Sequence, residues 1–403
     1  MATSVPLHVV SKHENGKNAI LHTTDTRESL QPESVRVKAR LISLSSNNLT
    51  YACFGSLLHL WDAFPVPKST AEPEPSEDWG IVPAWGYAIV IESVIESIPK
   101  GSTLWGYWPT SPHAVDLKLA PGVVAGQWTE VSPGRKRLMT AYNQYRQVDV
   151  QKFGNLEALT ALCKPLRVAA YLLNAAVFNP KAPIPPAGTG QWTAADADLS
   201  SAVVVALAAS SKTGRAFAWE LLRNRPENGP LALLQVTSTP TMLQSHETGH
   251  PTRVVDYGSL STAVPWITSL SPSRIVVVDF GAAPEVVEEL VSLIPAGIQI
   301  ALVAVGLEAK AYTDIELKKR MEVAQKLQMV QFNGSDVRDA VMKGREVAYY
   351  YEVEESWNRC LVQQGMGEVG FEAVQGAAGM EIAWQKLCEG KVKGGSGYVV
   401  SFD

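Results

Sequence analysis

The chain has 403 residues, a length that fits two domains, and its 46% of hydrophobic residues supplies enough core material to exclude a largely disordered protein. Its 35 basic and 40 acidic residues give a net charge of −5 without a basic tract, so neither nucleic acid nor an anionic membrane surface is expected as a partner. The sequence has neither the apolar core of a signal peptide nor an apolar run of membrane-spanning length, which predicts a soluble, cytoplasmic protein.

The first third of the chain has the pattern of β structure. Residues 35–41 alternate apolar and charged side chains, as in a strand with one buried face. Apolar and aromatic runs follow at 80–86, 87–91 and 103–107. Between these strands, the segment 65–78 is rich in Pro, Ala and Glu, and it is expected to form an exposed loop.

Residues 45–55 follow the first alternating strand and are interpreted as a polar loop. Two amides and a phenol there, with Asn48 and Tyr51 as the candidate catalytic residues, could hold a carbonyl substrate. The alternative is an ordinary polar turn that Gly55 closes. The chain also has 11 Trp residues, which suit a flat, apolar ligand.

The organisation changes near residue 155. Residues 156–178 have a helical pattern that Pro165 must kink or restart. Beyond them, apolar runs alternate with helical segments, with strands expected at 202–207, 231–236, 274–280 and 298–305 and helices at about 213–225 and 284–294. Continuous β-branched runs that alternate with helices predict an α/β fold with a parallel sheet covered on both faces.

The turn after the first of these strands, residues 207–215, is a candidate phosphate site. A strand, small side chains and a helix N-terminus together present backbone N–H groups to an anion, and a glycine at 214 permits close packing of the helix. The fingerprint G-x-G-x-x-G is absent, so an ordinary βα turn is the alternative, and a P-loop would need glycines that are missing here. The candidate cofactor-binding residues are Ser210, Ser211, Lys212, Thr213 and Gly214.

The end of the second strand distinguishes the two dinucleotides. An acid at this point binds the ribose of NAD and repels the 2′-phosphate of NADP. Residues 236–240 contain no acid, and the hydroxyls of Thr237 and Ser238 can donate to a phosphate. The sequence therefore favours NADPH as the cofactor.

A zinc site is not expected. Residues 246–250 match H-E-x-x-H, but Gly249 lies inside the motif and Pro251 follows it, so the helix that this metal site requires cannot form well. The cysteines at 53, 163, 360 and 388 have no short spacing, which argues against both a Cys-rich metal site and a disulfide framework.

The C-terminal part is expected to begin with one long helix over 335–363. A helix at 380–387, a turn and a final strand within 391–402 follow. Because no parallel partner for this strand is expected nearby, it is predicted to return to the N-terminal β region.

This order of domains resembles the medium-chain dehydrogenase/reductase superfamily. Tyr51 and Gly55 match the pattern N-x-x-D-x-Y-x-x-x-G of its zinc-free quinone reductases, whereas Ser46 and Leu49 stand where that pattern has Asn and Asp. The resemblance implies a GroES-like β domain and a Rossmann-type doubly wound parallel sheet. The implied division is 1–155 for the first domain, 156–345 for the cofactor domain, and 346–403 for a helix and the return to the first domain.

The same resemblance implies further cofactor contacts. Residues 254–257 resemble the segment whose tyrosine, here Tyr257, contacts the 2′-phosphate in NADP members. Residues 303–306 resemble the strand end that passes the nicotinamide, which assigns Val305 and Gly306 to the cofactor. More narrowly, the chain is similar to the family called domain of unknown function 2855, on the segments 47–52, 83–86, 142–145 and 209–213.

We therefore expect an NADPH-dependent, zinc-independent reductase of a carbonyl or conjugated enone on an apolar small molecule, active as a monomer or homodimer in fungal secondary metabolism of the polyketide type. Tyr51 or Asn48 would donate to the developing oxyanion. Alternatively, Ser211 and Lys212 add too much bulk for a pyrophosphate, and the scaffold catalyses a cofactor-independent, redox-neutral isomerisation, dehydration or cyclisation. A non-enzymatic role as a partner of another biosynthetic protein rests only on the loop 65–78.

Overall fold

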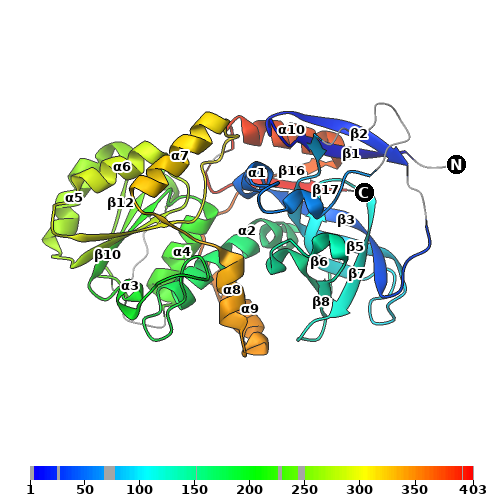
Figure 1. Ribbon diagram of the computed structural model, residues 1–403, viewed down its shortest axis with the longest axis horizontal. Helices are drawn as coiled ribbons and strands as arrows, with labels where there is room; N and C mark the ends of the chain where they lie inside the picture. Colours follow the sequence, from blue (N-terminus) through cyan, green and yellow to red (C-terminus); the bar gives the residue numbers. More distant parts are fainter. Residues whose placement is uncertain are drawn as a thin grey trace. The chain divides into compact units, whose positions relative to one another are not determined.

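The computed structural model describes residues 4–24, 28–67, 78–150, 152–225, 229–243, 250–392 and 394–402. The chain forms two compact units, whose elements are labelled in Figure 1. Unit 1 comprises residues 1–164, 309–312 and 370–403, and unit 2 comprises residues 165–308 and 313–369. The division falls inside helix α2 (Asn155–Leu172), and helix α9 (Glu346–Val362) belongs to unit 2, whereas the expected division placed it with the C-terminal return.

An eight-stranded sheet is the main body of unit 1. In spatial order, its strands are β16 (Phe371–Gln375), β17 (Gly397–Ser401), β3 (Ser34–Leu44), β5 (Pro83–Ser93), β6 (Thr103–Pro109), β9 (Gln144–Val148), β8 (Gln127–Glu130) and β7 (Ala114–Pro121). Strand β7 also pairs with β3, so the sheet closes on itself around an apolar core. This is the predicted GroES-like domain.

A smaller sheet completes unit 1. The hairpin of β1 (Ser4–Ser11) and β2 (Asn18–Thr24) pairs through β1 with β4 (Trp79–Gly80). Helix α10 (Gly376–Cys388) packs on this hairpin, where the indole of Trp384 donates to the carbonyl of Asn15 at 2.9 Å. The sequence pattern did not reveal the hairpin.

The predicted return of the chain's last strand is confirmed. Strand β17 pairs antiparallel with β3, with Tyr398 opposite Leu44. The expectation that β17 lacks a parallel neighbour is wrong, because β16 pairs with it in parallel. The strand expected at 35–41 is β3, and those expected at 80–86 and 87–91 are largely parts of one strand, β5.

Unit 2 contains the predicted parallel sheet. Its order is β12 (Thr252–Val255), β11 (Ala232–Val236), β10 (Ala202–Leu207), β13 (Arg274–Asp279), β14 (Gln299–Ala304) and β15 (Val330–Gln331), and every neighbouring pair is parallel. Strands β10 and β13 are buried along almost their whole length, as their β-branched runs predict. Since β10 lies in the middle and the chain winds outward to both edges, the sheet is doubly wound.

Helices cover this sheet on both faces (Figure 1). On one face, α5 (Leu260–Ser269) and α6 (Pro284–Leu293) pack their apolar side chains against those of β10 and β13. α4 (Lys212–Arg223) packs through Phe217, whose ring contacts those of Phe178 and Phe280.

The short helical segments of the two units are α3 (Ala194–Ala197), a π-helical turn (Leu173–Val177) and short 3-10 helices at Leu60–Asp62, Pro133–Arg135, Thr140–Asn143, Pro240–Met242 and Tyr257–Ser259.

Two predicted elements need correction. The long helix expected over 335–363 is two helices, α8 (Gly334–Met342) and α9, because Gly344 adopts a φ of +77° between them. The loop expected over 45–55 is mostly the helix α1 (Ser46–Cys53), which Ser45 and Asn48 begin with a capping box. Helix α7 (Asp314–Lys326) was not predicted at all.

Two expected features lie largely beyond what can be described. Residues 68–77 of the Pro-rich segment and residues 246–249 of the H-E-x-x-H match are outside the described residues. The roles considered for both therefore stay predictions. Within the described ranges, no helix combines the length and the apolar composition needed to cross a bilayer.

Candidate functional site

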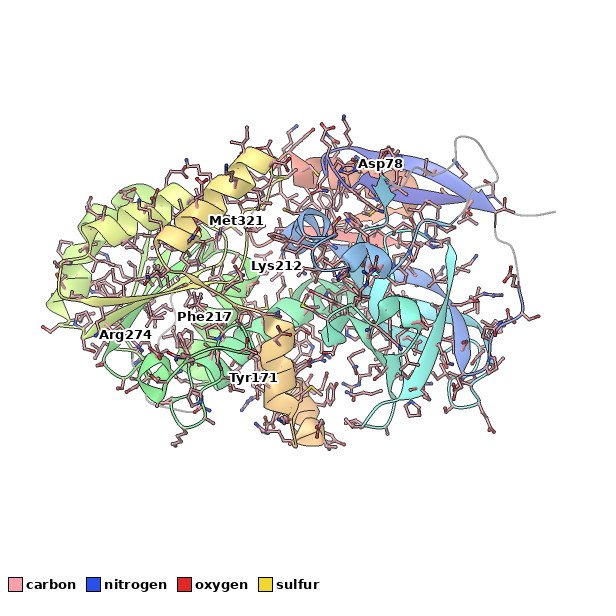
Figure 2. The ribbon with its side chains drawn as sticks, in the orientation of Figure 1. Asp78, Tyr171, Lys212, Phe217, Arg274 and Met321 are labelled. Atoms are coloured by element: carbon pink, nitrogen blue, oxygen red, sulfur yellow. The ribbon has the colours of Figure 1, made fainter. Side chains whose placement is uncertain are left out.

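The turn between β10 and α4 is the predicted phosphate site. Strand β10 ends at Leu207, and Ala208 reverses the chain with a φ of +52°. Ser211 is the N-cap of α4, and its Oγ accepts a hydrogen bond from the amide of Gly214 at 3.1 Å. The helix begins at the buried Lys212, labelled in Figure 2, so the positive end of the helix dipole lies at this turn.

Gly214 brings helix and turn into close contact. A Cβ at this position would lie 2.8 Å from the carbonyl oxygen of Ala209, closer than real Cβ atoms approach an oxygen. Three amides of the turn are bonded within the protein: Ala209 donates to Val236 at 3.1 Å, Ser211 donates to Ala208 at 3.0 Å, and Gly214 is capped as described. An anion bound here would lie at the first turn of α4, where the positive end of the helix dipole favours negative charge.

Hydroxyl groups gather beside this turn at the end of β11. The Oγ of Ser210 lies 2.6 Å from Oγ1 of Thr237, and Oγ1 of Thr239 donates to Ser210 at 3.0 Å. The structure thus brings together two predicted residues, Ser210 and Thr237, while the neighbouring Ser238 is exposed. Thr239 was missed, although it belongs to the same run of hydroxyl residues.

Tyr257 lies at the same carboxyl edge of the sheet. Its phenol is half-buried and interacts with the backbone of Ala208 and with the charge of Asp279. Burial, together with Asp279, raises the pKa of Tyr257 to about 12, and the Ala208 contact opposes this rise. The phenol therefore keeps its proton at neutral pH and can donate it to an anion.

Val305 and Gly306, the residues expected at the nicotinamide, follow β14 directly. Both amides donate to the carbonyl oxygen of Asp279, at 2.8 and 3.3 Å. The carboxylate of Asp279 accepts from the amides of Gly281 and Ala282 and pairs with Arg320 at 2.8 Å. Sequence analysis missed both Asp279 and Arg320, because no motif marks them.

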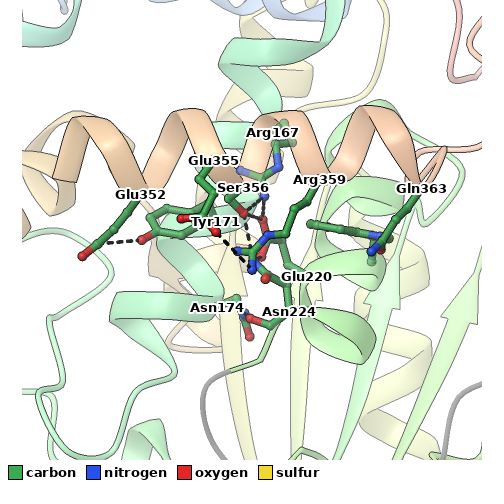
Figure 3. Close-up of polar contacts among 11 residues, drawn as sticks. Arg167, Tyr171, Asn174, Glu220, Asn224, Glu352, Glu355, Ser356, Arg359 and Gln363 are labelled. Carbon is green, nitrogen blue, oxygen red and sulfur yellow. Dashed lines mark hydrogen bonds and ion pairs between the residues drawn. The ribbon is translucent and has the colours of Figure 1, made fainter. Parts of the chain in front are cut away.

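A buried ion pair anchors α4 from its other end (Figure 3). Arg167 of α2 pairs with Glu220 of α4 and donates to Ser356 of α9, and the side chains of the pair have no exposed surface. Asn224 adds bonds to Glu220 at 2.6 Å and to Ser356 at 2.9 Å. Burial raises the pKa of Glu220, and the charge of Arg167 opposes this rise.

In unit 1, Asn48 has a structural position. Its Oδ1 accepts from the amide of Ser45 at 2.9 Å, and its Nδ2 donates to the carbonyl of Pro83 at 3.0 Å. The side chain is buried. Both ends of the amide thus fasten α1 to its own N-terminus and to β5.

Tyr51 is buried on the same helix, where two N–H groups donate to its hydroxyl. They are Nδ2 of Asn47 at 2.7 Å and Nε1 of Trp85 at 3.0 Å. The hydroxyls of Tyr142 and Tyr107 also interact with it, so the phenol lies at the centre of a buried polar cluster. Burial raises the pKa of Tyr51, while the hydrogen bonds to Trp85, Tyr142 and Asn47 oppose that rise.

Aromatic rings surround Tyr51. Tyr107 and Tyr142 meet its ring edge to face, with ring centroids 5.4 and 5.6 Å away, and they stack on each other at 4.5 Å. The indole of Trp85 lies 5.2 Å from the ring of Tyr107 and stacks with Trp105 at 6.2 Å. This cluster gives Tyr51 a rigid and apolar environment.

Metal ligands do not gather in the described ranges: no three His, Cys, Asp or Glu side chains there are arranged to hold an ion. Independence from zinc stays a prediction, since residues 246–249 are outside those ranges.

Solved structures share this fold. CurA in complex with NADPH from Vibrio vulnificus has a TM-score of 0.55 and 12% identity, over 100% of this chain and 99% of that chain. The CurF ER cyclopropanase from the curacin A biosynthetic pathway has a TM-score of 0.54 and 13% identity, over 99% of both chains. The quinone oxidoreductase from Coxiella burnetii has a TM-score of 0.50 and 13% identity, also over 99% of both chains. At such identities, the likeness establishes the fold.

The sequence itself matches one family model. No curated protein matches the sequence of this chain significantly. The model described as "Protein of unknown function (DUF2855)" matches residues 42–393, most of the chain. The chain therefore belongs to this DUF2855 family.

Proposed function

We propose that the protein is an NADPH-dependent, zinc-independent reductase of a carbonyl or conjugated enone on an apolar small molecule. The observation that carries the proposal is the turn between β10 and α4. There, a helix N-terminus, the buried Lys212 and the hydroxyls of Ser210 and Thr237 meet at the carboxyl edge of a doubly wound sheet. A solved structure of the same fold, CurA from Vibrio vulnificus, is a complex with NADPH, which supports this choice.

The residues of unit 2 fit the cofactor. The first turn of α4, at Lys212 and Thr213, would be the cradle for the pyrophosphate, because the positive end of the helix dipole lies there, with Ser210 and Ser211 beside it. The 2′-phosphate would be held by Thr237, Ser238 and Tyr257, since all three carry hydroxyls and no acid stands at this strand end. Val305 and Gly306 would lie beside the nicotinamide.

Unit 1 supplies the proton donor. When bound, NADPH provides the hydride that reduces the substrate. Tyr51 is the better of the two predicted donors, because burial raises the pKa of its phenol, which therefore keeps a proton to donate. Asn48 is assigned to holding α1 in place, since both ends of its amide are bonded within the fold. The aromatic rings around Tyr51 suit a flat, conjugated substrate of natural-product type.

A second candidate function is a redox-neutral isomerisation, dehydration or cyclisation without a cofactor. One observation favours it: the amides of Ala209, Ser211 and Gly214 are bonded within the protein and are not offered to a diphosphate. In that case, Tyr51 would act as the acid without hydride transfer.

Titration with NADPH separates the two functions. A reductase should bind NADPH with a Kd in the micromolar range and shift the fluorescence of the cofactor to the blue, and Lys212→Glu should weaken binding at least about 100-fold by placing a like charge at the phosphates. The control is Lys318→Glu, because Lys318 is an exposed lysine of the same unit. Unchanged affinity in Lys212→Glu would refute this phosphate site. Absence of binding at millimolar NADPH by a folded protein would favour the redox-neutral enzyme.

A further inference from the structure

The two chain segments that leave β13 and β14 are held by one guanidinium. Arg320 lies on α7, and its side chain is 12% exposed. Its Nη1 donates to the carbonyl of Ala282 at 2.7 Å, and its Nη2 donates to Oδ2 of Asp279 at 2.8 Å and to the carbonyl of Gly306 at 3.0 Å. A single side chain thus joins the end of β13, the segment after β13 and the segment after β14.

Asp279 is the acidic partner of Arg320. Its Oδ1 accepts from the amides of Gly281 at 2.9 Å and Ala282 at 2.7 Å, while Oδ2 pairs with Arg320. Its backbone carbonyl accepts from both amides of the Val305–Gly306 segment. Because the carboxylate is fully buried, it needs the guanidinium and the amides to remain charged.

The two segments have no free space between them. Gly281 has a φ of +117°, and a Cβ there would overlap the carbonyl of Leu307. A Cβ on Gly306 would lie 2.7 Å from the carbonyl of Phe280. Backbone therefore lies directly on backbone, and a shift of the first segment moves the second.

The hydrogen bonds of Arg320 stay at the ends of β13 and β14, on Asp279, Ala282 and Gly306. Asp279 acts on the phenol of Tyr257, at the phosphate site, only through its charge. All of these residues belong to unit 2. From α7, the guanidinium of Arg320 donates to the carbonyl oxygen of Gly306. The backbone amides of Val305 and Gly306 both donate to the carbonyl oxygen of Asp279.

We propose that Arg320, together with Asp279, is a positioning residue for the nicotinamide half of the cofactor. It fixes the conformation of Val305 and Gly306 without contacting the ligand, and it leaves the adenosine half, at the β10–α4 turn, unaffected. This inference rests on the proposed function, since it takes NADPH as the ligand.

The test compares two ligands that share the adenosine half. NADPH reaches both ends of the site, whereas adenosine 2′,5′-bisphosphate lacks the nicotinamide. In calorimetric titrations, Arg320→Ala should weaken NADPH binding about tenfold or more and leave the Kd of the bisphosphate within about twofold. Arg320→Lys should restore part of the NADPH affinity, because an ammonium group can pair with Asp279 but cannot span all three acceptors.

A matched variant controls for the loss of a positive charge. Lys326→Ala removes a cation from the same helix, where Lys326 pairs with Glu288 at an exposed site, and it should change neither Kd. Equal weakening of both ligands by Arg320→Ala, or NADPH binding within about twofold of the unmodified protein, would overturn the inference. If Arg320→Ala does not fold, Arg320→Lys gives the same comparison, with selective weakening of NADPH as the supporting result. An unmodified protein that binds neither ligand contradicts the proposed function itself, a result distinct from a failure of Arg320 alone.

Discussion

The two units bury polar side chains around their candidate sites in different ways. Around Tyr51, the buried groups are neutral: a phenol, an amide and an indole joined by two hydrogen bonds among aromatic rings. In unit 2, buried groups at the carboxyl edge of the parallel sheet and on helix α4 are charged and paired, as in Asp279–Arg320 and Arg167–Glu220. A neutral group that loses its partner costs one hydrogen bond, whereas a buried charge that loses its partner is left almost unsolvated. The paired charges of unit 2 should therefore be more sensitive to single substitutions than the neutral groups around Tyr51.

The largest effect is expected at the Arg167–Glu220 pair. Glu220→Ala leaves the guanidinium of Arg167 buried without a counter-charge, so it should lower the free energy of unfolding of unit 2 by about 3–5 kcal/mol. The double variant Arg167→Met with Glu220→Leu should recover most of this loss, since apolar side chains of similar volume replace both charges. Thermal and urea denaturation measure both effects. A loss below about 1 kcal/mol in Glu220→Ala would remove the contrast between the units.

Acid should act on unit 1 through a buried neutral histidine. His8 of β1 has no exposed surface and contacts Oδ1 of Asn18 through Nε2 at 3.2 Å, and its burial lowers its pKa from 6.5 to about 4. Because the folded pKa lies below the unfolded value, the unfolded chain binds the proton first. The contribution to stability is therefore complete above pH 6.5 and is lost as the pH falls towards 4, up to about 3 kcal/mol.

The measurement is the difference in stability between pH 7 and pH 4.5. His8→Gln should show a smaller fall than the unmodified protein, because its side chain does not titrate, and the difference between the two falls isolates the contribution of His8. Equal falls in both proteins would show that this histidine is not the acid-sensitive group.

The smallest loss of stability is expected at Tyr51. Tyr51→Phe keeps the ring and its aromatic neighbours, but it leaves Nδ2 of Asn47 and Nε1 of Trp85 without their acceptor. Unit 1 should lose about 1–2 kcal/mol of stability. The proposed reductase should lose most of its kcat while its Kd for NADPH stays the same, because the phenol acts on the substrate. A full kcat in Tyr51→Phe would transfer the role of proton donor to another group.

The fold was largely predictable because its strongest signals are local. The buried runs at 202–207 and 274–279 are almost entirely β-branched or small, which fits parallel strands that are covered on both faces. The helix α1 was mistaken for a loop, since its asparagines are weak helix formers and its stability comes from the cap at Ser45 and the bond to Pro83.

The candidate site was predictable only where chain order marks it. The β10–α4 turn follows the first strand of a βα unit, so its position identifies it as a possible anion site. Arg320 and Asp279 are 41 residues apart and belong to a helix and a strand end with no motif between them. Their meeting depends on how α7 packs, and this information is not contained in any local pattern of side chains.

The antiparallel pairing of β17 with β3 also bears on how the protein is made. On the ribosome, the whole of unit 2, as far as Val369, is synthesised before β17, so its sheet can form while translation continues. Residues 41–44 of β3, made early, must wait for their partner until residues 397–401 emerge, and such an unpaired strand edge is prone to pair with other chains. The nascent protein thus depends on a strand made after all of unit 2 to cover this part of β3, and the uncovered edge is open to other chains during that interval.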